Sequence, residues 1–353
     1  MAHPGSDQFG MAQQMAANML RFGWYSGLNW LADRRSAASG VEAPGVRVER
    51  PVPSRKELFA DLADLFRRDA ELVRDGIAAP MAADPARGIR DHLGRLRAML
   101  DDVPDAAARR RSRDAATVTH LAAAAAVPEY FAQDFHFQKG GYLADDSARI
   151  YDVQVETLFY GSAAAMRRQA LRPIAEAIAG RDQRQVALLD VACGTGRLLR
   201  EVRLVFPAMS LTGLDLSAAY LREAAGHLSG LRRAQLIAAN AEAIPLPDAS
   251  QDVVTTIFLF HELPGDVRRR VASEMARVLK PGGTLVFVDS LQMGDRPAWD
   301  GLLEAFPQRF HEPYYRQYAI DDVDGLFDSV GLAAQASQTA FLSKMLVRRK
   351  ALC

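Results

Sequence analysis

Short apolar runs alternate with helical stretches in the second half of the chain, and this alternation restricts the fold more than any other feature of the sequence. The runs are short, and the one at 252–260 is strongly β-branched. They lie at 186–191, 211–215, 234–239, 252–260 and 284–289, with two more candidates at 333–340 and 341–348. Buried strands alternating with helices predict an α/β fold with a doubly wound, mostly parallel sheet of seven strands.

The first third of the chain shows helical periodicity instead. Apolar residues recur at three- and four-residue spacing over 9–35, after Ser54, and in a helix expected to start at Asp84-Pro85. Ser54 and Glu57 form a predicted capping box. An Ala-rich helical segment is expected over 105–127, ending at Pro128. The predicted units are an N-terminal all-helical domain (1–127), a connecting or lid segment with helices (128–180) and an α/β domain (181–353).

Composition excludes several classes of protein. The 43 basic residues balance the 43 acidic ones, so no bulk charge attracts nucleic acid or an anionic membrane. The two cysteines, Cys193 and Cys353, are too few for a disulfide framework, which fits a reducing compartment. No apolar run reaches the roughly 20 residues that cross a bilayer, and the N-terminus lacks the pattern of a secretory signal. We therefore expect a cytoplasmic protein that does not bind nucleic acid.

The most informative local pattern joins the first apolar run to the next helix. It reads Leu188-Leu-Asp-Val-Ala-Cys-Gly-Thr-Gly-Arg-Leu-Leu199. Gly194 and Gly196 allow the backbone to approach a ligand closely, and the start of the helix offers free N–H groups. Asp215 ends the next strand, where a carboxylate can accept hydrogen bonds from both hydroxyls of a ribose. Together the two features indicate a nucleoside site.

These residues resemble the first two motifs of the class I S-adenosylmethionine-dependent methyltransferases, and more narrowly the group like the ubiquinone/menaquinone C-methyltransferases (methyltransferase type 11). The resemblance covers roughly 151–289. Three further motifs follow in order: residues 238–254, Ile257-Phe-Leu-Phe-His-Glu-Leu-Pro264, and Arg277-Val-Leu-Lys-Pro-Gly-Gly-Thr-Leu285. The resemblance implies that residues 181–353 form the Rossmann-like methyltransferase sheet of this class and that the cofactor is S-adenosyl-L-methionine.

The resemblance also implies cofactor-binding residues. They are Tyr151, Asp190, Ala192, Gly194, Gly196, Asp215, Leu216, Asn240, Ala241 and Phe258. Residues of the glycine turn would surround the methionine portion, Asp215 the ribose, and Asn240 and Ala241 the adenine. Ala192 stands where many relatives have glycine, which the turn tolerates if φ is negative. Asn240 replaces a frequent aspartate, so its carbonyl oxygen would accept the adenine amino hydrogen.

Methyl transfer to a phenol, enol or activated carbon requires a group that takes a proton, and histidine suits this at neutral pH. His261 follows a predicted strand, with Glu262 beside it, whereas His311 and Tyr315 belong to an aromatic segment. The candidate catalytic residues are His261, His311, Glu262 and Tyr315, with a packing role for His261 and for the aromatic segment left open. No His-x-x-x-His or paired-cysteine spacing is present, so the sequence predicts no metal site; metal-dependent O-methylation is a minority alternative.

We therefore expect methyl transfer to a small aromatic or hydrophobic molecule at carbon or oxygen. The alternatives are N-methylation of a small amine and a non-catalytic cofactor-binding protein whose helical region is an interaction module. The expected partner is the small-molecule acceptor. The 9–35 helix carries few basic residues, which favours docking on the catalytic domain or on a second copy in a homodimer over contact with a membrane.

Overall fold

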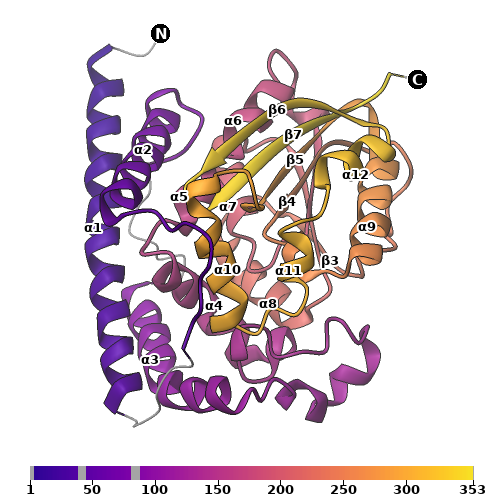
Figure 1. The fold of residues 1–353 in the computed structure, drawn as a ribbon. Coiled ribbons are helices and arrows are strands. Elements are labelled where there is room, and N and C mark those ends of the chain that lie inside the picture. Colours follow the sequence, from indigo (N-terminus) through magenta and orange to yellow (C-terminus); the bar gives the residue numbers. More distant parts are fainter. Residues whose placement is uncertain (1–3, 39–44, 81–87, 353) are drawn as a thin grey trace.

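Seven strands form a single sheet in the order β3-β2-β1-β4-β5-β7-β6 in the computed structural model, which describes residues 4–38, 45–80 and 88–352 (Figure 1). The strands are β1 (Ala187–Val191), β2 (Ser210–Asp215), β3 (Gln235–Ala238), β4 (Gln251–Ile257), β5 (Leu279–Ser290), β6 (Leu332–Ala340) and β7 (Ser343–Lys350). The first five are parallel, and β7 runs antiparallel to both β5 and β6. The predicted seven-stranded, mostly parallel sheet is confirmed.

Helices cover both faces of this sheet because successive side chains of a strand point to opposite faces. Leu188 belongs to the core cluster that includes α6 (Leu171–Ala177) and α7 (Arg197–Val205). Leu189 belongs to the cluster on the other face, with α9 (Gly265–Val278) and α12 (Val323–Ser329). Strand β1 is thus buried on both sides, as expected for the middle of a parallel sheet.

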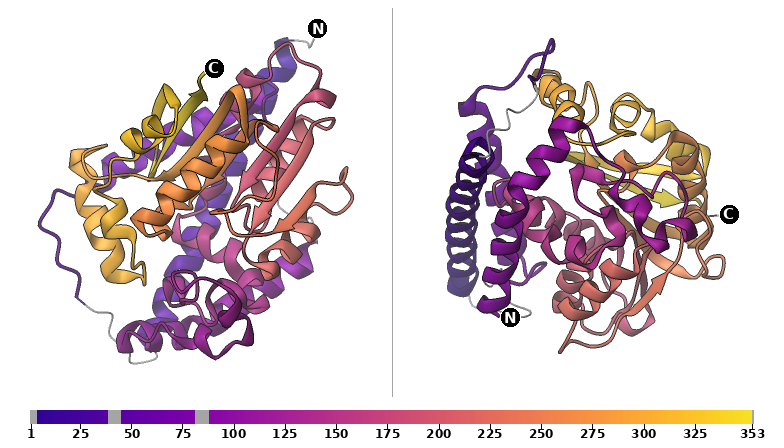
Figure 2. Two further views of the ribbon diagram at one scale, coloured as in Figure 1. Left: turned by 90° about the vertical axis from the view of Figure 1, so that its right-hand side faces the viewer. Right: turned by 90° about the horizontal axis from the view of Figure 1, so that it is seen from below.

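The N-terminal helices stand on one side of the molecule, with α1 (Pro4–Ala38) outermost (Figure 2). Next to α1 lie α2 (Arg55–Arg74) and α3 (Ile89–Ser112). The predicted capping box at the start of α2 is confirmed, since Ser54 and Glu57 bond reciprocally. Arg21 of α1 pairs with Glu156 of α4 (Asp145–Leu158) at 3.0 Å. The middle of α1 therefore contacts the segment that precedes the sheet.

The prediction of one helix over 105–127 is wrong, and the predicted start at Asp84-Pro85 lies outside the described residues. Helix α3 continues through Pro104, whose ring removes one backbone hydrogen bond, and the freed carbonyl of Leu100 accepts one from Arg35 at 2.8 Å. After Ser112 the chain forms short 3₁₀ turns, Thr117–His120 and Ala122–Ala126. Asp134 holds the first turn by accepting from the backbone N–H groups of residues 117 and 118.

Helix α2 contributes to a core that crosses the predicted domain boundaries. Leu65 and Phe66 of α2 pack in one buried cluster with Met166 of α5 (Ala163–Arg168), Trp299 and Phe341. The boundaries at 127/128 and 180/181 remain predictions, but the helical region and the sheet region share this apolar cluster. In the described part of the chain no helix is long and apolar enough to span a membrane.

Candidate active site

The turn between β1 and α7 has three residues in the left-handed region of the Ramachandran map. Their φ angles are 56° for Ala192, 53° for Gly194 and 74° for Gly196. We expected the turn to tolerate Ala192 if its φ were negative, and that expectation was wrong because its φ is positive. Ala192 lies at the wall of an open cavity and carries the backbone strain of this conformation.

Asp215 lies at the carboxyl end of β2 and joins that end to the glycine turn. Its Oδ2 accepts a hydrogen bond from the backbone N–H of Gly194, and its Oδ1 accepts one from Ser217, both at 2.8 Å. Burial raises the pKa of Asp215 to about 6, against the lowering effect of these two bonds. The carboxylate is therefore fixed in orientation and faces the cavity.

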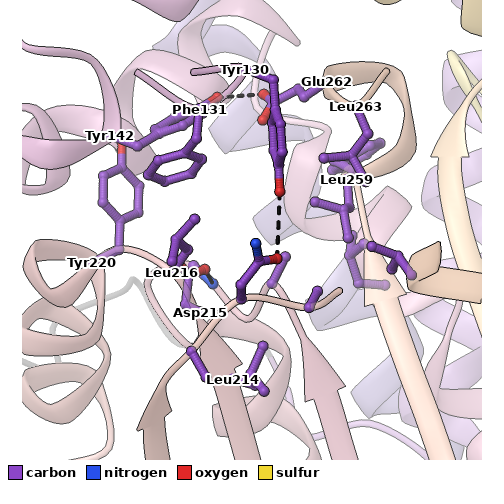
Figure 3. Close-up of a pocket in the computed structure, with 18 of the residues that line it drawn as sticks. Tyr130, Phe131, Tyr142, Leu214, Asp215, Leu216, Tyr220, Leu259, Glu262 and Leu263 are labelled. Carbon is purple, nitrogen blue, oxygen red and sulfur yellow. Dashed lines mark hydrogen bonds between the residues drawn. The ribbon is translucent and has the colours of Figure 1, made fainter. Parts of the chain in front are cut away.

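This cavity encloses about 720 Å³ of space, open in part to solvent, beyond the carboxyl ends of β1, β2 and β4 (Figure 3). Eight of the ten predicted cofactor-binding residues line it: Tyr151, Ala192, Gly194, Asp215, Leu216, Asn240, Ala241 and Phe258. Asp190 and Gly196 lie behind the wall. Asp190 accepts from the hydroxyl of Thr255 at 2.7 Å, and burial raises its pKa to about 7. At Gly196 a Cβ would come within 2.9 Å of Ala224, so glycine is needed there for packing.

Asn240 is held by its neighbours. Its Oδ1 accepts from the backbone N–H of Glu242 at 2.9 Å and lies 3.4 Å from the hydroxyl of Tyr130, and its Nδ2 donates to Glu242. The carbonyl oxygen that was expected to receive an adenine amino hydrogen thus already has a backbone partner. The second lone pair of this oxygen faces the hydroxyl of Tyr130, which also donates to Glu242 at 2.6 Å, so an adenine amino group would compete with Tyr130 for it.

Four aromatic residues that the resemblance did not point to form a wall of the cavity: Tyr130, Phe131, Tyr142 and Tyr220 (Figure 3). Three of them come from the segment between α3 and α4, where aromatic residues occur without a regular period. That irregular aromatic run was the signal in the sequence. Tyr151, on α4, packs edge-on against Tyr142 and Tyr220 with ring centroids 6.2 and 5.2 Å apart.

Helix α4 is fastened to the glycine turn by Asp152. This buried carboxylate accepts from the hydroxyl of Thr195 at 2.7 Å and from Arg197 at 2.8 Å. Although burial opposes ionisation, the charge of Arg197 and these bonds hold the pKa of Asp152 well below its usual range. Tyr151 is therefore placed over the cavity by an ionic contact of the residue beside it.

Glu262 is the single candidate catalytic residue that borders the cavity, on the side opposite Asp215 (Figure 3). Its carboxylate accepts a hydrogen bond from the hydroxyl of Tyr142. His261 lies behind it, with Nδ1 2.6 Å from a carboxylate oxygen of Asp289. Burial disfavours the charged imidazole, but the charge and hydrogen bond of Asp289 outweigh it and raise the pKa of His261 to about 9. At neutral pH His261 is therefore a cation.

The other two candidates point elsewhere. The hydroxyl of Tyr315 is 2.7 Å from that of Ser290, and its ring packs against His261. Burial raises the pKa of Tyr315. His311 has its Nε2 2.9 Å from Oε1 of Gln133, and burial lowers its pKa. Neither His311 nor Tyr315 lines the cavity, so their predicted catalytic roles stay predictions.

Comparison with known proteins supports the resemblance found in the sequence. Residues 188–283 match the model of a family described as "Methyltransferase domain". Over these residues the chain is similar to methyltransferases, as the sequence motifs predicted. Its first glycine turn, the Asp215 strand and the helix after β4 all fall within the matched residues.

Curated relatives of the methyltransferase domain include two groups of named proteins. A ubiquinone/menaquinone biosynthesis C-methyltransferase UbiE of Methylobacterium nodulans is 35% identical over 46% of this chain and 63% of its own. A demethylmenaquinone methyltransferase of Listeria welshimeri is 32% identical over 39% and 62%. The chain thus spans about three-fifths of the length of these relatives. A crystal structure of a SAM-dependent methyltransferase from Aquifex aeolicus shares 19% identity over 51% of this chain and 88% of that one, with a TM-score of 0.39.

Proposed function

We propose that this protein transfers a methyl group from S-adenosylmethionine to a small aromatic or hydrophobic acceptor, at carbon or oxygen. The observation that carries the proposal is one cavity with two chemically different sides. One side has the half-buried carboxylate of Asp215 and the glycine turn, and the other has the aromatic wall and Glu262. The first suits a nucleoside and the second an apolar, planar molecule.

The residues around Asp215 fit the cofactor. A Cβ placed on Gly194 would meet no atom within 4 Å, so the backbone at that point borders open space. Each oxygen of Asp215 has one backbone donor and keeps acceptor capacity for a ribose hydroxyl. Asn240 and Ala241 border the same cavity beyond β3, where an adenine would lie.

When bound, S-adenosylmethionine supplies an electrophilic methyl group and leaves as S-adenosylhomocysteine. The chain's own residues then have three tasks: to exclude water, to orient the acceptor and to place a polar side chain next to the acceptor. Tyr151 and Phe258 border the cavity and exclude water. Glu262 provides a carboxyl group next to the acceptor, with Tyr142 fixing its orientation, and burial raises the pKa of Glu262 to about 7. His261, paired with Asp289 and 3.9 Å from Glu262, is a positioning residue.

The acceptor class is supported by the aromatic wall and by the printed names of the relatives. Those relatives are named for methylation in ubiquinone and menaquinone synthesis. A dihydroxylated aromatic ring of that kind would stack against tyrosine and phenylalanine side chains. The quinol 1,4-dihydroxynaphthalene is therefore a suitable first probe for the acceptor.

The test is calorimetric titration with S-adenosylmethionine and S-adenosylhomocysteine, followed by mass spectrometry of products. We expect Asp215→Ala to weaken both ligands by about 10- to 100-fold, because a charged hydrogen-bond acceptor contributes roughly 1.5–3 kcal/mol. Asp182→Ala, at an aspartate exposed on the surface, is the control and should bind as the wild type. If the intact protein bound neither ligand, the cofactor site would be wrong. Cofactor binding without methylation of the naphthalenediol, a phenol or an amine would favour a non-catalytic binding protein.

A further inference from the structure

Three metal-ligating side chains from distant segments meet next to the cavity. His136 comes from the turn between α3 and α4, Glu262 from the turn after β4, and Glu312 from the segment between α10 (Asp300–Arg309) and α11 (Tyr315–Tyr318). One ligand atom of each lies within 4.8 Å of those of the other two. Nε2 of His136 is 3.1 Å from Oε1 of Glu312 and 3.9 Å from Oε1 of Glu262.

Glu312 lacks the partners that a buried carboxylate needs. The residue is 4% exposed, and neither of its carboxylate oxygens has a hydrogen-bond partner in the described structure. Its short contact with His136 does not have hydrogen-bond geometry. A buried, unpaired polar group of this kind is costly, and an unpaired charge more so. Glu312 is therefore the side chain of this cluster that most needs a further partner, and a cation is one that a carboxylate accepts.

We propose that His136, Glu262 and Glu312 bind a divalent transition-metal ion, with Zn²⁺ as the representative. One imidazole and two carboxylates are donors that such ions accept, and three protein ligands leave a further coordination position open. The ion neutralises two carboxylates that otherwise repel each other in a buried site. The three ligands are so far apart in sequence that no spacing motif indicates them.

Surrounding groups hold two of these three residues, Glu262 and His136, in place. Tyr142 donates to Glu262, and the backbone N–H of His136 donates to the carbonyl of His311 at 3.1 Å. The ring of His136 is flanked by Phe306 and Phe310, at 6.2 and 5.8 Å between centroids. Outer contacts that fix the direction of a ligand are a regular part of metal sites.

The proposed ion would border the cavity, because Glu262 lines it. Its open position could then receive an oxygen or nitrogen atom of a bound molecule. The site is inferred from the geometry of the three side chains and does not depend on methyl transfer. Metal binding and methyl transfer can therefore be measured, and can fail, separately.

The first experiment removes metal from the full chain with a chelator and then titrates Zn²⁺ in competition with a chromophoric chelator. We expect one ion per chain, and a loss of at least tenfold in affinity in His136→Ala and in Glu312→Gln. His120→Ala replaces an exposed histidine of the same region and is the control. Co²⁺ should give a visible absorption spectrum that the two variants lose. No binding of Zn²⁺ or Co²⁺, or binding that both variants retain, overturns the proposal.

Thermal unfolding provides a second measurement that separates a lost ligand from a misfolded variant. In the metal-free protein, Glu312→Gln should be at least as stable as the wild type, because it removes a carboxylate without partners. Zn²⁺ should raise the melting temperature of the wild type and not that of the variant. A metal-free variant that is much less stable, together with an unchanged response to Zn²⁺, would identify Glu312 as a packing residue and contradict the proposal.

Discussion

Ala192 lies in the cofactor turn with a backbone conformation that favours glycine. Its φ of 56° places an L-residue with a Cβ in a region that costs roughly 1–2 kcal/mol, and glycine adopts the same conformation without that cost. Ala192 lines the open cavity.

We expect Ala192→Gly to leave stability unchanged or raise it by up to about 1 kcal/mol, because relief of strain exceeds the added freedom of the unfolded chain. Ala187→Gly, in the extended backbone of β1, is the matched control and should destabilise by about 0.5–1 kcal/mol. Urea unfolding of the three proteins measures both changes. A clear loss of stability in Ala192→Gly would show that contacts of the Cβ matter more than φ.

Asp215 makes cofactor affinity depend on pH. Its pKa is raised to about 6 by burial, and the form that accepts hydrogen bonds from a ribose on both oxygens is the ionised one. As pH falls below about 6 the carboxyl gains a proton, so affinity should fall. Between pH 7 and pH 5 we expect a loss of about tenfold in the affinity for S-adenosylhomocysteine.

The control for this pH effect is Asp215→Asn, whose weaker binding should change less over the same range. Calorimetry at pH 5, 6 and 7 provides the measurement. If the affinity of the variant fell as steeply with pH as that of the wild type, another carboxyl group would be responsible. Asp190, whose pKa is raised to about 7, would then be the first residue to substitute.

At the scale of elements, a buried polar network ties α1 and α2 to α5. Asp69 of α2 accepts hydrogen bonds from Arg168 at 2.7 Å, from Gln14 at 2.7 Å and from Asn18 at 2.8 Å. Asp69 and Arg168 are 0% and 1% exposed. Breaking such a pair leaves an unpaired charge in the interior.

Asp69→Ala should lower the free energy of unfolding by about 3 kcal/mol, at the lower end of the range for a broken buried pair, because Glu201 also lies 3.2 Å from Arg168. Asp64→Ala breaks exposed ion pairs on the same helix and should change it by less than about 1 kcal/mol. Guanidinium unfolding gives both values. Equal effects in the two variants would mean that the network does not hold the helices together.

The positions of the strands could be predicted from sequence because each has its own local pattern, and all but β3 and β6 are largely buried. Strand β2 was expected at 211–215 and observed at Ser210–Asp215. The segment 105–127 was mispredicted because its conformation depends on a distant residue: Asp134 captures the backbone N–H groups that a helix would use. Helical propensity of an alanine-rich run does not outweigh such a contact.

At the scale of the whole molecule, the two sides of the cavity differ in how far sequence could reveal them. The cofactor side consists of strand ends and turns. A residue that ends a predicted parallel strand can be placed at the carboxyl edge of the sheet from the sequence alone. The aromatic wall and the triad of His136, Glu262 and Glu312 assemble from separate segments. His311 illustrates the limit: its segment was identified, but its ring turns toward Gln133.

The cluster that joins α2 to Trp299 and Phe341 also has a consequence for synthesis on the ribosome. Leu65 and Phe66 leave the ribosome long before these two partners, and Asp69 leaves it long before Arg168. The apolar side chains of α2 therefore stay exposed until the ribosome has made Phe341, which precedes the last strand. Nascent chains of this protein should depend on chaperones for most of their translation, since exposed apolar surface promotes aggregation.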